Sequence, residues 1–172
     1  MATDLSINQD ALKTFNDKIK GIKFAMLTTI DQDGTLRSRP MAAQQHDSDG
    51  TLWFFTWADS EKVHEIQRDQ QVNLTYCKPG DNAWVSVSGT AQLVRDPALM
   101  QSLWRPHLSA WFPKGLHDPN LALLKVTVAR AEFWDSPSGI GAAIAILRNT
   151  ITDNPKPLGE DTKLDISRPA SH

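Results

Sequence analysis

The sequence predicts a mainly β fold, a mixed barrel of about six strands with a few short helices placed between them. Short runs rich in β-branched and aromatic residues alternate with clusters of Asp, Gly, Pro and Ser, as strands alternate with turns. Only short segments space their apolar residues as helices do. The chain has no internal repeat, and its 172 residues are a length typical of one domain, which we expect to span residues 1–172.

The N-terminal part predicts a helix followed by consecutive strands. Residues 8–20 space their apolar side chains as an amphipathic helix does, and Gly21 is typical of the residue that ends one. Turns that contain Asp and Gly separate the next strands, which are expected over residues 22–30, 35–45 and 51–57. Three consecutive antiparallel strands are the simplest arrangement of these segments.

The remaining elements follow the same two patterns. Residues 83–94 alternate polar and apolar side chains, which indicates a long strand with one buried face. Further strands are expected over residues 71–77 and 121–134, and short helices over residues 62–68, 98–104, 109–112 and 140–147. The N-terminal helix lies within residues 1–20, and residues 150–172 are expected to form a polar C-terminal tail.

Charge and cysteine content exclude several classes of partner. A net charge of −2 gives no field that would attract nucleic acid or an anionic membrane. The single cysteine, Cys77, excludes an internal disulfide framework and suits a reducing cytoplasm. Residues 1–10 lack the pattern of a signal peptide, and no apolar run is long enough to cross a bilayer. We therefore expect a soluble, cytoplasmic protein.

Metal and nucleophile chemistry have little support in the sequence. The 5 histidines are scattered without ligand spacing, and Cys77 completes no metal set, so we expect no metal site. There is no nucleophile elbow and no glycine-rich phosphate loop. The 6 tryptophans outnumber the single tyrosine, and each needs either a packing slot or a ligand face, of which packing is the commoner use.

The stretch from Arg37 to Lys62 is the strongest candidate for a binding site. Arg37 and Arg39 are two apart on a predicted strand, so both side chains project from one face and can clamp a phosphate. Lys62 adds its charge to the N-terminus of a helix that begins near Ser60. Taken singly, these features are typical of a solvated strand face and an ordinary helix cap. Joined by one hairpin, and with the Thr56 hydroxyl at the strand end, they favour an anion site.

These residues belong to motifs through which the chain resembles the general stress protein 26 group of the pyridoxamine 5′-phosphate oxidase-like flavoproteins. The resemblance covers residues 11–138, and residues 159–165 also look like that group. Its specificity lies in the order and spacing of the motifs rather than in any one of them. The motifs are Arg37-Ser38-Arg39-Pro40-Met41, Phe55-Thr56-Trp57, Ser60-Glu61-Lys62, Ser88-Gly89 and Phe133-Trp134-Asp135-Ser136-Pro137.

The resemblance implies an FMN-binding split barrel, antiparallel and Greek-key-like, with about six strands and about three to five short helices. It also implies a homodimer that holds FMN, or FAD as the alternative, at the subunit interface, and a small-molecule electron donor or acceptor. The motif positions imply phosphate, ribityl and ring contacts from one subunit through Arg37, Ser38, Arg39, Pro40, Met41, Phe55, Thr56, Ser60 and Lys62. They place Trp84 and Val85 where the partner subunit reaches across, Trp111 in a loop that closes over the flavin, and Trp134 in a ring-contacting position.

Two departures from the true pyridoxamine-phosphate oxidases argue against vitamin B6 oxidation. Gln44 stands where those enzymes carry a lysine for the substrate phosphate, and their C-terminal arginine and histidine segment has no counterpart after Trp134. We therefore expect an FMN-dependent oxidoreductase of undefined substrate, linked to stress response. The alternatives are a non-catalytic protein that binds or sequesters flavin, a haem-binding split barrel, and a plain interaction module without a small ligand.

Overall fold

The computed structural model describes residues 9–44, 49–135 and 160–166 of the chain. The elements in these residues are α1 (Gln9–Ile19), β1 (Phe24–Ile30), β2 (Leu36–Ala42), β3 (Thr51–Trp57), α2 (Glu61–Arg68), β4 (Gln71–Lys78), η1 (Pro79–Asp81), β5 (Ala83–Val94), α3 (Pro97–Leu103), η2 (Pro106–Ala110), η3 (Gly115–His117), β6 (Leu121–Asp135) and β7 (Glu160–Asp165). The strands predicted over residues 51–57 and 83–94 have the expected bounds, and the other predicted elements in this part form with shifted ends. The η elements are single 3₁₀ turns.

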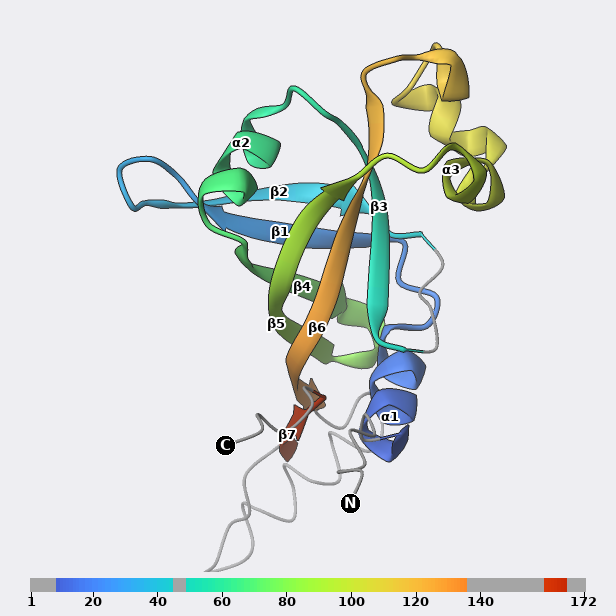
Figure 1. The fold of residues 1–172 in the computed structure, drawn as a ribbon. Coiled ribbons are helices and arrows are strands. Elements are labelled where there is room, and N and C mark those ends of the chain that lie inside the picture. Colours follow the sequence, from blue (N-terminus) through green and yellow to red (C-terminus); the bar gives the residue numbers. More distant parts are fainter. Residues whose placement is uncertain (1–8, 45–48, 136–159, 167–172) are drawn as a thin grey trace, which may run out of the picture.

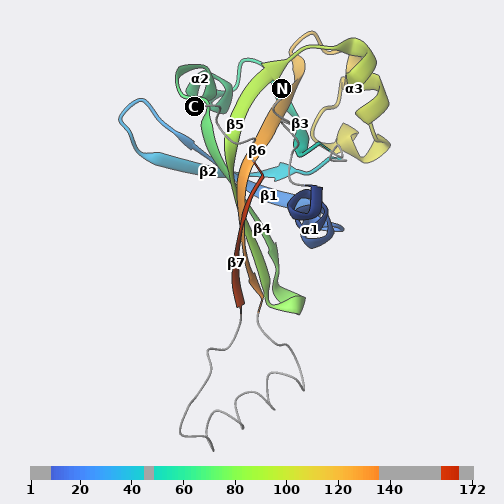
Figure 2. The same ribbon diagram turned by 60° about the horizontal axis from the view of Figure 1, so that its bottom comes forward.

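The strands form one curled antiparallel sheet in the order β2-β1-β4-β5-β6-β3, with β7 paired to the C-terminal end of β6. β2 and β3 therefore stand at opposite ends of the order, yet the sheet curls until they approach each other (Figures 1 and 2). Just after β2, the backbone N–H of Gln44 donates to the carbonyl of Trp53 at 3.3 Å. A curled sheet that does not close through a full ladder is a split barrel, so the predicted fold class is confirmed.

The barrel interior is filled by alternate side chains of its strands and is covered at one end by α1 (Figure 1). Leu12, Phe15 and Ile19 project from one face of α1 into this core, which confirms the predicted amphipathic helix. The strands contribute fully buried side chains that include Leu27, Phe54, Leu74, Val85 and Phe133. Each such side chain contributes roughly 1.5–3 kcal/mol through its removal from water.

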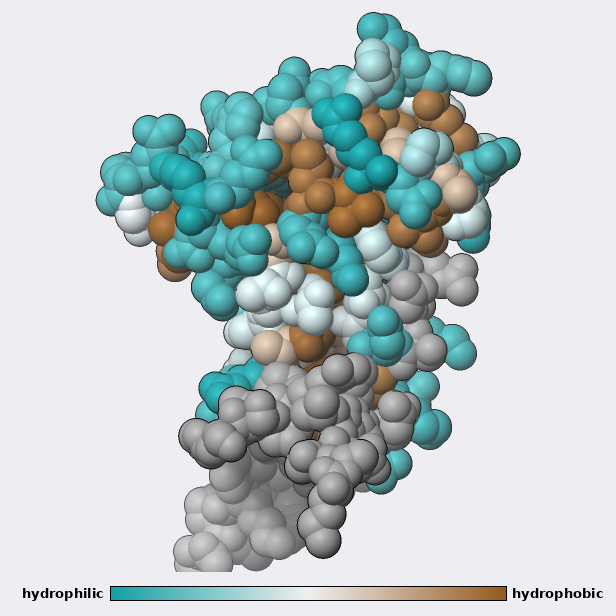
Figure 3. Space-filling view, viewed as in Figure 1, coloured by the Kyte–Doolittle hydropathy of each residue, from teal (hydrophilic) through white to brown (hydrophobic). Residues whose placement is uncertain are grey.

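Strand β3 buries both of its faces. Leu52 and Phe54 point into the barrel core, whereas Trp53 and Phe55 belong to a second apolar cluster outside it. α3 and the 3₁₀ turns after it cover this second cluster with Met100, Leu103, Leu108 and Phe112. The segment from α3 to η3 thus lies on the opposite side of β5 and β6 from α2 (Figure 2). Apolar side chains reach the surface between α2 and this segment (Figure 3).

Two features of the sheet differ from the sequence-based prediction. β3 pairs with β6 rather than with β2, so the expected run of three consecutive antiparallel strands is wrong beyond the β1–β2 hairpin. The physical reason is that β3 has two apolar faces and both must be buried. Beside β6, one face of β3 packs in the barrel core and the α3 segment covers the other.

The predicted polar tail contains the seventh strand, β7, whose side chains from Thr162 to Asp165 are mostly exposed and so lack apolar alternation. The helix predicted over residues 140–147 lies outside the described residues.

Gly89 lies buried at a shift of register between β5 and β6, and a Cβ built there would lie 2.2 Å from the carbonyl oxygen of Thr127. We expect Gly89→Ala to lower the free energy of unfolding by about 1–3 kcal/mol, because the backbone must move to admit the methyl group. Chemical denaturation measures this change. The control is Gly80→Ala, since a Cβ at Gly80 meets nothing within 4 Å. Equal unfolding midpoints for the two variants would contradict the close approach.

Candidate functional site

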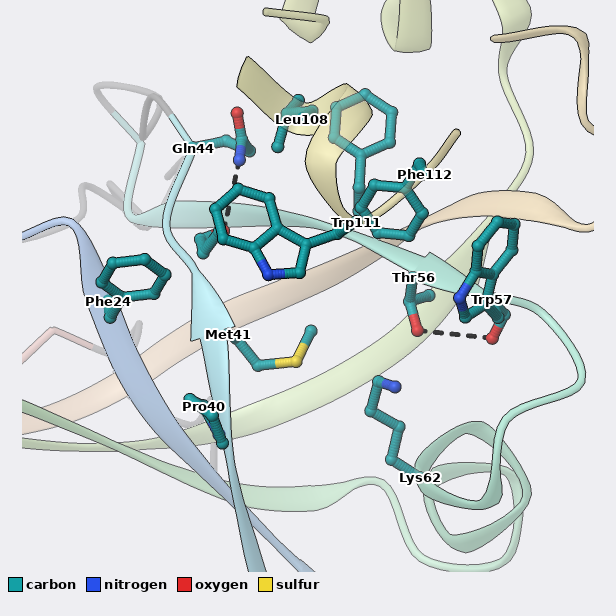
Figure 4. A pocket seen from close by; sticks show the side chains of 12 residues that line it. Phe24, Pro40, Met41, Gln44, Thr56, Trp57, Lys62, Leu108, Trp111 and Phe112 are labelled. Atoms are coloured by element: carbon teal, nitrogen blue, oxygen red, sulfur yellow. Dashed lines mark hydrogen bonds between the residues drawn. The ribbon is translucent and has the colours of Figure 1, made fainter. Parts of the chain in front are cut away.

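A pocket of about 250 Å³ opens where the ends of β2 and β3 approach the start of α2 (Figure 4). The side chains that line it come from β1, β2, β3, α2 and the segment around η2. They are Phe24, Pro40, Met41, Ala42, Gln44, Phe55, Thr56, Trp57, Lys62, Leu108, Trp111 and Phe112. The structure therefore brings together several residues that the sequence analysis had selected, namely Pro40, Met41, Phe55, Thr56, Lys62 and Trp111.

The polar end of the pocket is built where β3 turns into α2. The hydroxyl of Thr56 lies 3.4 Å from the hydroxyl of Ser60. Ser60 occupies the N-cap position in an extended conformation, but its side chain makes no capping bond to the helix and donates instead to the carbonyl of Trp57 at 2.7 Å. The first turn of α2 is therefore not capped by this side chain, and a helix N-terminus in that state is suited to an anion.

Lys62 extends from the first turn of α2 with its ammonium group directed toward Thr56 (Figure 4). It forms no ion pair with any carboxylate of the described residues. Partial burial, and then the nearby Arg39 guanidinium, lower the pKa of Lys62 below its usual value, whereas the Glu65 carboxylate opposes this. A half-buried cation without a counter-ion is unfavourable, so this side chain is suited to binding an anion.

The two arginines of β2 are held by carboxylates and do not line the pocket. The guanidinium of Arg39 donates to the Glu65 carboxylate at 2.8 Å and to the hydroxyl of Thr29. Arg37 pairs with Asp31 in a separate hollow between the β1–β2 turn and α2. Of the cations that the sequence analysis grouped together, Lys62 thus faces the pocket, Arg39 lies close enough to act on its charge, and Arg37 faces the other hollow.

Aromatic side chains form much of the remaining wall. Trp111 follows η2 and packs edge-on against Phe24, with ring centroids 6.0 Å apart. Phe112 makes a similar contact with Trp57 at 4.9 Å. At the far end of the pocket, the Gln44 amide donates to the carbonyl of Ala42 at 3.2 Å (Figure 4). A cation and a hydroxyl at one end, with aromatic walls beyond them, suit a ligand that carries an anionic group and a flat ring.

The sequence analysis missed several lining residues, namely Phe24, Trp57, Leu108 and Phe112. Phe24 lies in the strand predicted over residues 22–30, in which alternate side chains of β1 are exposed or half-buried. The exposed face of β1 therefore includes Phe24 at 48% and Met26 at 41% exposure. The only sequence signal for this is the position of Phe24 relative to the buried Ala25 and Leu27.

The other predicted site residues lie away from the pocket in this chain. Trp84 and Trp134 are opposite each other across β5 and β6, on the outer face of the sheet, and each is 39% exposed. Val85 points the other way, into the barrel core. Ser38 is exposed and its hydroxyl lies 2.6 Å from that of Thr28. The roles that the resemblance gave to Trp84, Val85 and Trp134 therefore require a second subunit, and they stay predictions.

The described residues lack two features that other functions would need. No group of three or more His, Cys, Asp and Glu side chains in this part of the chain is placed to hold a metal ion. No helix in it has both the length and the apolar character needed to cross a membrane.

Comparisons with known proteins agree with this architecture. Residues 10–156 match the sequence model of the family described as pyridoxamine 5′-phosphate oxidase like. The chain is 34% identical to the protein bli-3 of Neurospora crassa over 77% of its own length and 69% of that protein. It is 30% identical to general stress protein 26 of Bacillus subtilis over 69% of its own length and 84% of that protein.

A solved structure also resembles this chain in both sequence and fold. The general stress FMN/FAD binding protein of Xanthomonas citri is 31% identical, with a TM-score of 0.64 over 77% of this chain and 93% of that one. The family model covers most of the chain, two of the relatives at 30% identity or more are described as general stress proteins, and the curled sheet has the same fold. On these grounds, the chain belongs to the pyridoxamine 5′-phosphate oxidase-like family and is a relative of general stress protein 26.

Proposed function

We propose that this protein binds FMN in the pocket, as a homodimer, and works as a flavin-dependent oxidoreductase. The observation that carries the proposal is Lys62, a half-buried cation beside the Thr56 hydroxyl that pairs with no carboxylate of the described residues. A phosphate monoester fits a cation, a hydroxyl and a helix N-terminus that converge in this way. The relative from Xanthomonas citri, described as binding FMN or FAD, supports a flavin as the molecule that carries the phosphate.

The walls of the pocket support the same ligand. Met41, Phe24, Trp111 and Phe112 offer apolar surface that would exclude water from a flat ring. Lys62 is the one titratable side chain among the described residues that line the pocket. The redox chemistry would therefore be supplied by the flavin, and the chain's own residues would bind it, orient it and shield it.

A homodimer is supported by the outer face of the sheet. Phe24 lies at the pocket and on the exposed face of β1, together with Met26. The outer face of β5 and β6 exposes Trp84 and Trp134 as neighbours. Large apolar side chains gathered on one exposed face are typical of an interaction surface. A second copy on this face would bury them and complete the open side of the pocket, as the family resemblance implies. A link to stress response is supported by the relative in Bacillus subtilis.

We expect Lys62→Ala to weaken FMN binding roughly 10- to 150-fold, because charge-assisted hydrogen bonds are worth about 1.5–3 kcal/mol. Riboflavin has the same ring but no phosphate, so its affinity should change little. Titration of both ligands into the apoprotein, followed by flavin fluorescence, measures the difference.

The matched control for this charge change is Lys114→Ala, since Lys114 is exposed and lies outside the pocket. We expect this variant to bind both ligands as the unchanged protein does. An equal loss of FMN and riboflavin affinity in Lys62→Ala would show that Lys62 supports the shape of the pocket rather than a phosphate.

A redox role predicts that bound flavin is bleached by NADH or NADPH under anaerobic conditions and recovers its absorbance when an electron acceptor is admitted. Repeated cycles with excess donor would establish turnover. A flavin that stays oxidised in both titrations favours the sequestering alternative. A Soret band in the purified protein, without a flavin spectrum, favours the haem-binding alternative.

The proposed interface predicts that Trp134→Glu shifts the protein from dimer to monomer, because a charge would be buried against the second copy. Sedimentation velocity measures the mass. Ser102→Glu is the control, since it adds the same charge at an exposed position on α3. A dimer that persists in Trp134→Glu at low micromolar concentration would place the interface elsewhere.

A further inference from the structure

Glu65, Arg39 and Thr29 form a buried polar cluster one helical turn from Lys62. Glu65 and Thr29 are 4% and 1% exposed, which is unusual for a carboxylate and a hydroxyl. The Glu65 carboxylate accepts from Arg39 at 2.8 Å and from the Thr29 hydroxyl, which in turn accepts from Arg39. These residues belong to α2, β2 and β1, so the cluster ties together the elements that form the polar end of the pocket.

The cluster lies beside Lys62, so two cations, Lys62 and Arg39, are near one carboxylate, that of Glu65. Arg39 acts on Lys62 by repulsion, and Glu65 acts on it by attraction. Other charged side chains on or beside α2 line the separate hollow, namely Asp31, Arg37, Glu61, His64 and Arg68. Within that group Arg37 is paired with Asp31. Burial lowers the pKa of Lys62 most, and Arg39 and Glu65 then act on that pKa in opposite directions.

We propose that Glu65 is a positioning residue of the anion site, which holds and neutralises Arg39 so that Lys62 remains the cation that meets the ligand's phosphate. This inference rests on the proposed function and deepens it. Glu65 holds Arg39 by a hydrogen bond of 2.8 Å and follows Lys62 by one turn on α2, where side chains so spaced lie on the same face, so its carboxylate can act on both cations. Arg39 lowers the pKa of Lys62 and Glu65 raises it. Removal of the Arg39 charge should therefore raise this pKa, and removal of the Glu65 charge should lower it.

The test uses the ratio of riboflavin to FMN dissociation constants, measured at constant ionic strength from about pH 7 to about pH 11, a range that includes the usual lysine pKa of about 10.4 and values below it. The phosphate is already a dianion throughout this range, because its second pKa is about 6. Ionisation of the ring affects both ligands and cancels in the ratio. In the unchanged protein we expect FMN to be preferred while Lys62 is protonated, and the preference to fall as the pH rises through the pKa of Lys62.

Glu65→Gln should move this fall to lower pH, and Arg39→Met should move it to higher pH. Both variants break the same buried pair and both should destabilise the fold. A purely structural role would therefore leave the fall in place or move it in the same direction in both. Glu61→Gln is the control, since it removes an equal charge from the exposed face of α2 and should leave the fall in place.

The double variant Arg39→Met/Glu65→Gln keeps the test open if either single variant does not fold, because it leaves no buried charge unpaired. Arg39 has more influence on Lys62 than Glu65 has, so the fall in the double variant should lie above that of the unchanged protein. Equal FMN and riboflavin affinities in the unchanged protein would overturn the phosphate site itself. A clear FMN preference that does not fall with pH, or that moves in the same direction in both single variants, would overturn only the role of Glu65.

Discussion

The packing of β3 between two apolar clusters is the constraint on which the site depends. Phe54 is held in the barrel core and Phe55 under the α3 segment. A slip of one residue would exchange these two faces, so the register with β6 is strongly specified, and it sets Thr56 opposite Ala122. The chain enters α2 soon after β3 ends. The positions of the Thr56 hydroxyl and of Lys62 therefore follow from the burial of apolar residues beside them, together with the hydrogen bond from the Ser60 hydroxyl to the carbonyl of Trp57 at the turn.

Charge is distributed unevenly around the polar end of the pocket. Arg37 is more than half exposed and its pairing with Asp31 is the kind of surface contact that contributes little to stability. The Arg39–Glu65 pair is buried, so each charge in it needs the other. Among the described residues, Lys62 has neither a surface carboxylate partner nor a buried one. A bound phosphate is the simplest group that would satisfy it, and in the proposed function such binding would therefore also stabilise the fold.

Local patterns in the sequence predicted most elements, because strand alternation and turn residues are properties of short segments. They did not predict the β3–β6 ladder, which joins residues 51–57 to residues 121–127 and has no local signal. The same limit applies to the site. Thr56 and Lys62 flank one turn, and both line the pocket. The separation of Arg37 from Lys62 depends instead on Asp31 and Glu65, which reach Arg37 and Arg39 only through tertiary folding.

The pocket lies where the barrel is split, and this location has a physical reason. Where β2 and β3 approach each other, the described residues show a backbone bond from Gln44 to Trp53 in place of a continuous ladder. Side chains such as Met41 and Phe55 therefore fill the gap that strand pairing would otherwise close. Unpaired strand edges are normally covered, and a flat ligand in the pocket would lie against the edges of β2 and β3 and cover them. The incomplete closure of the sheet thus provides the space for the pocket, and a fully closed barrel of the same strands would have none at this position.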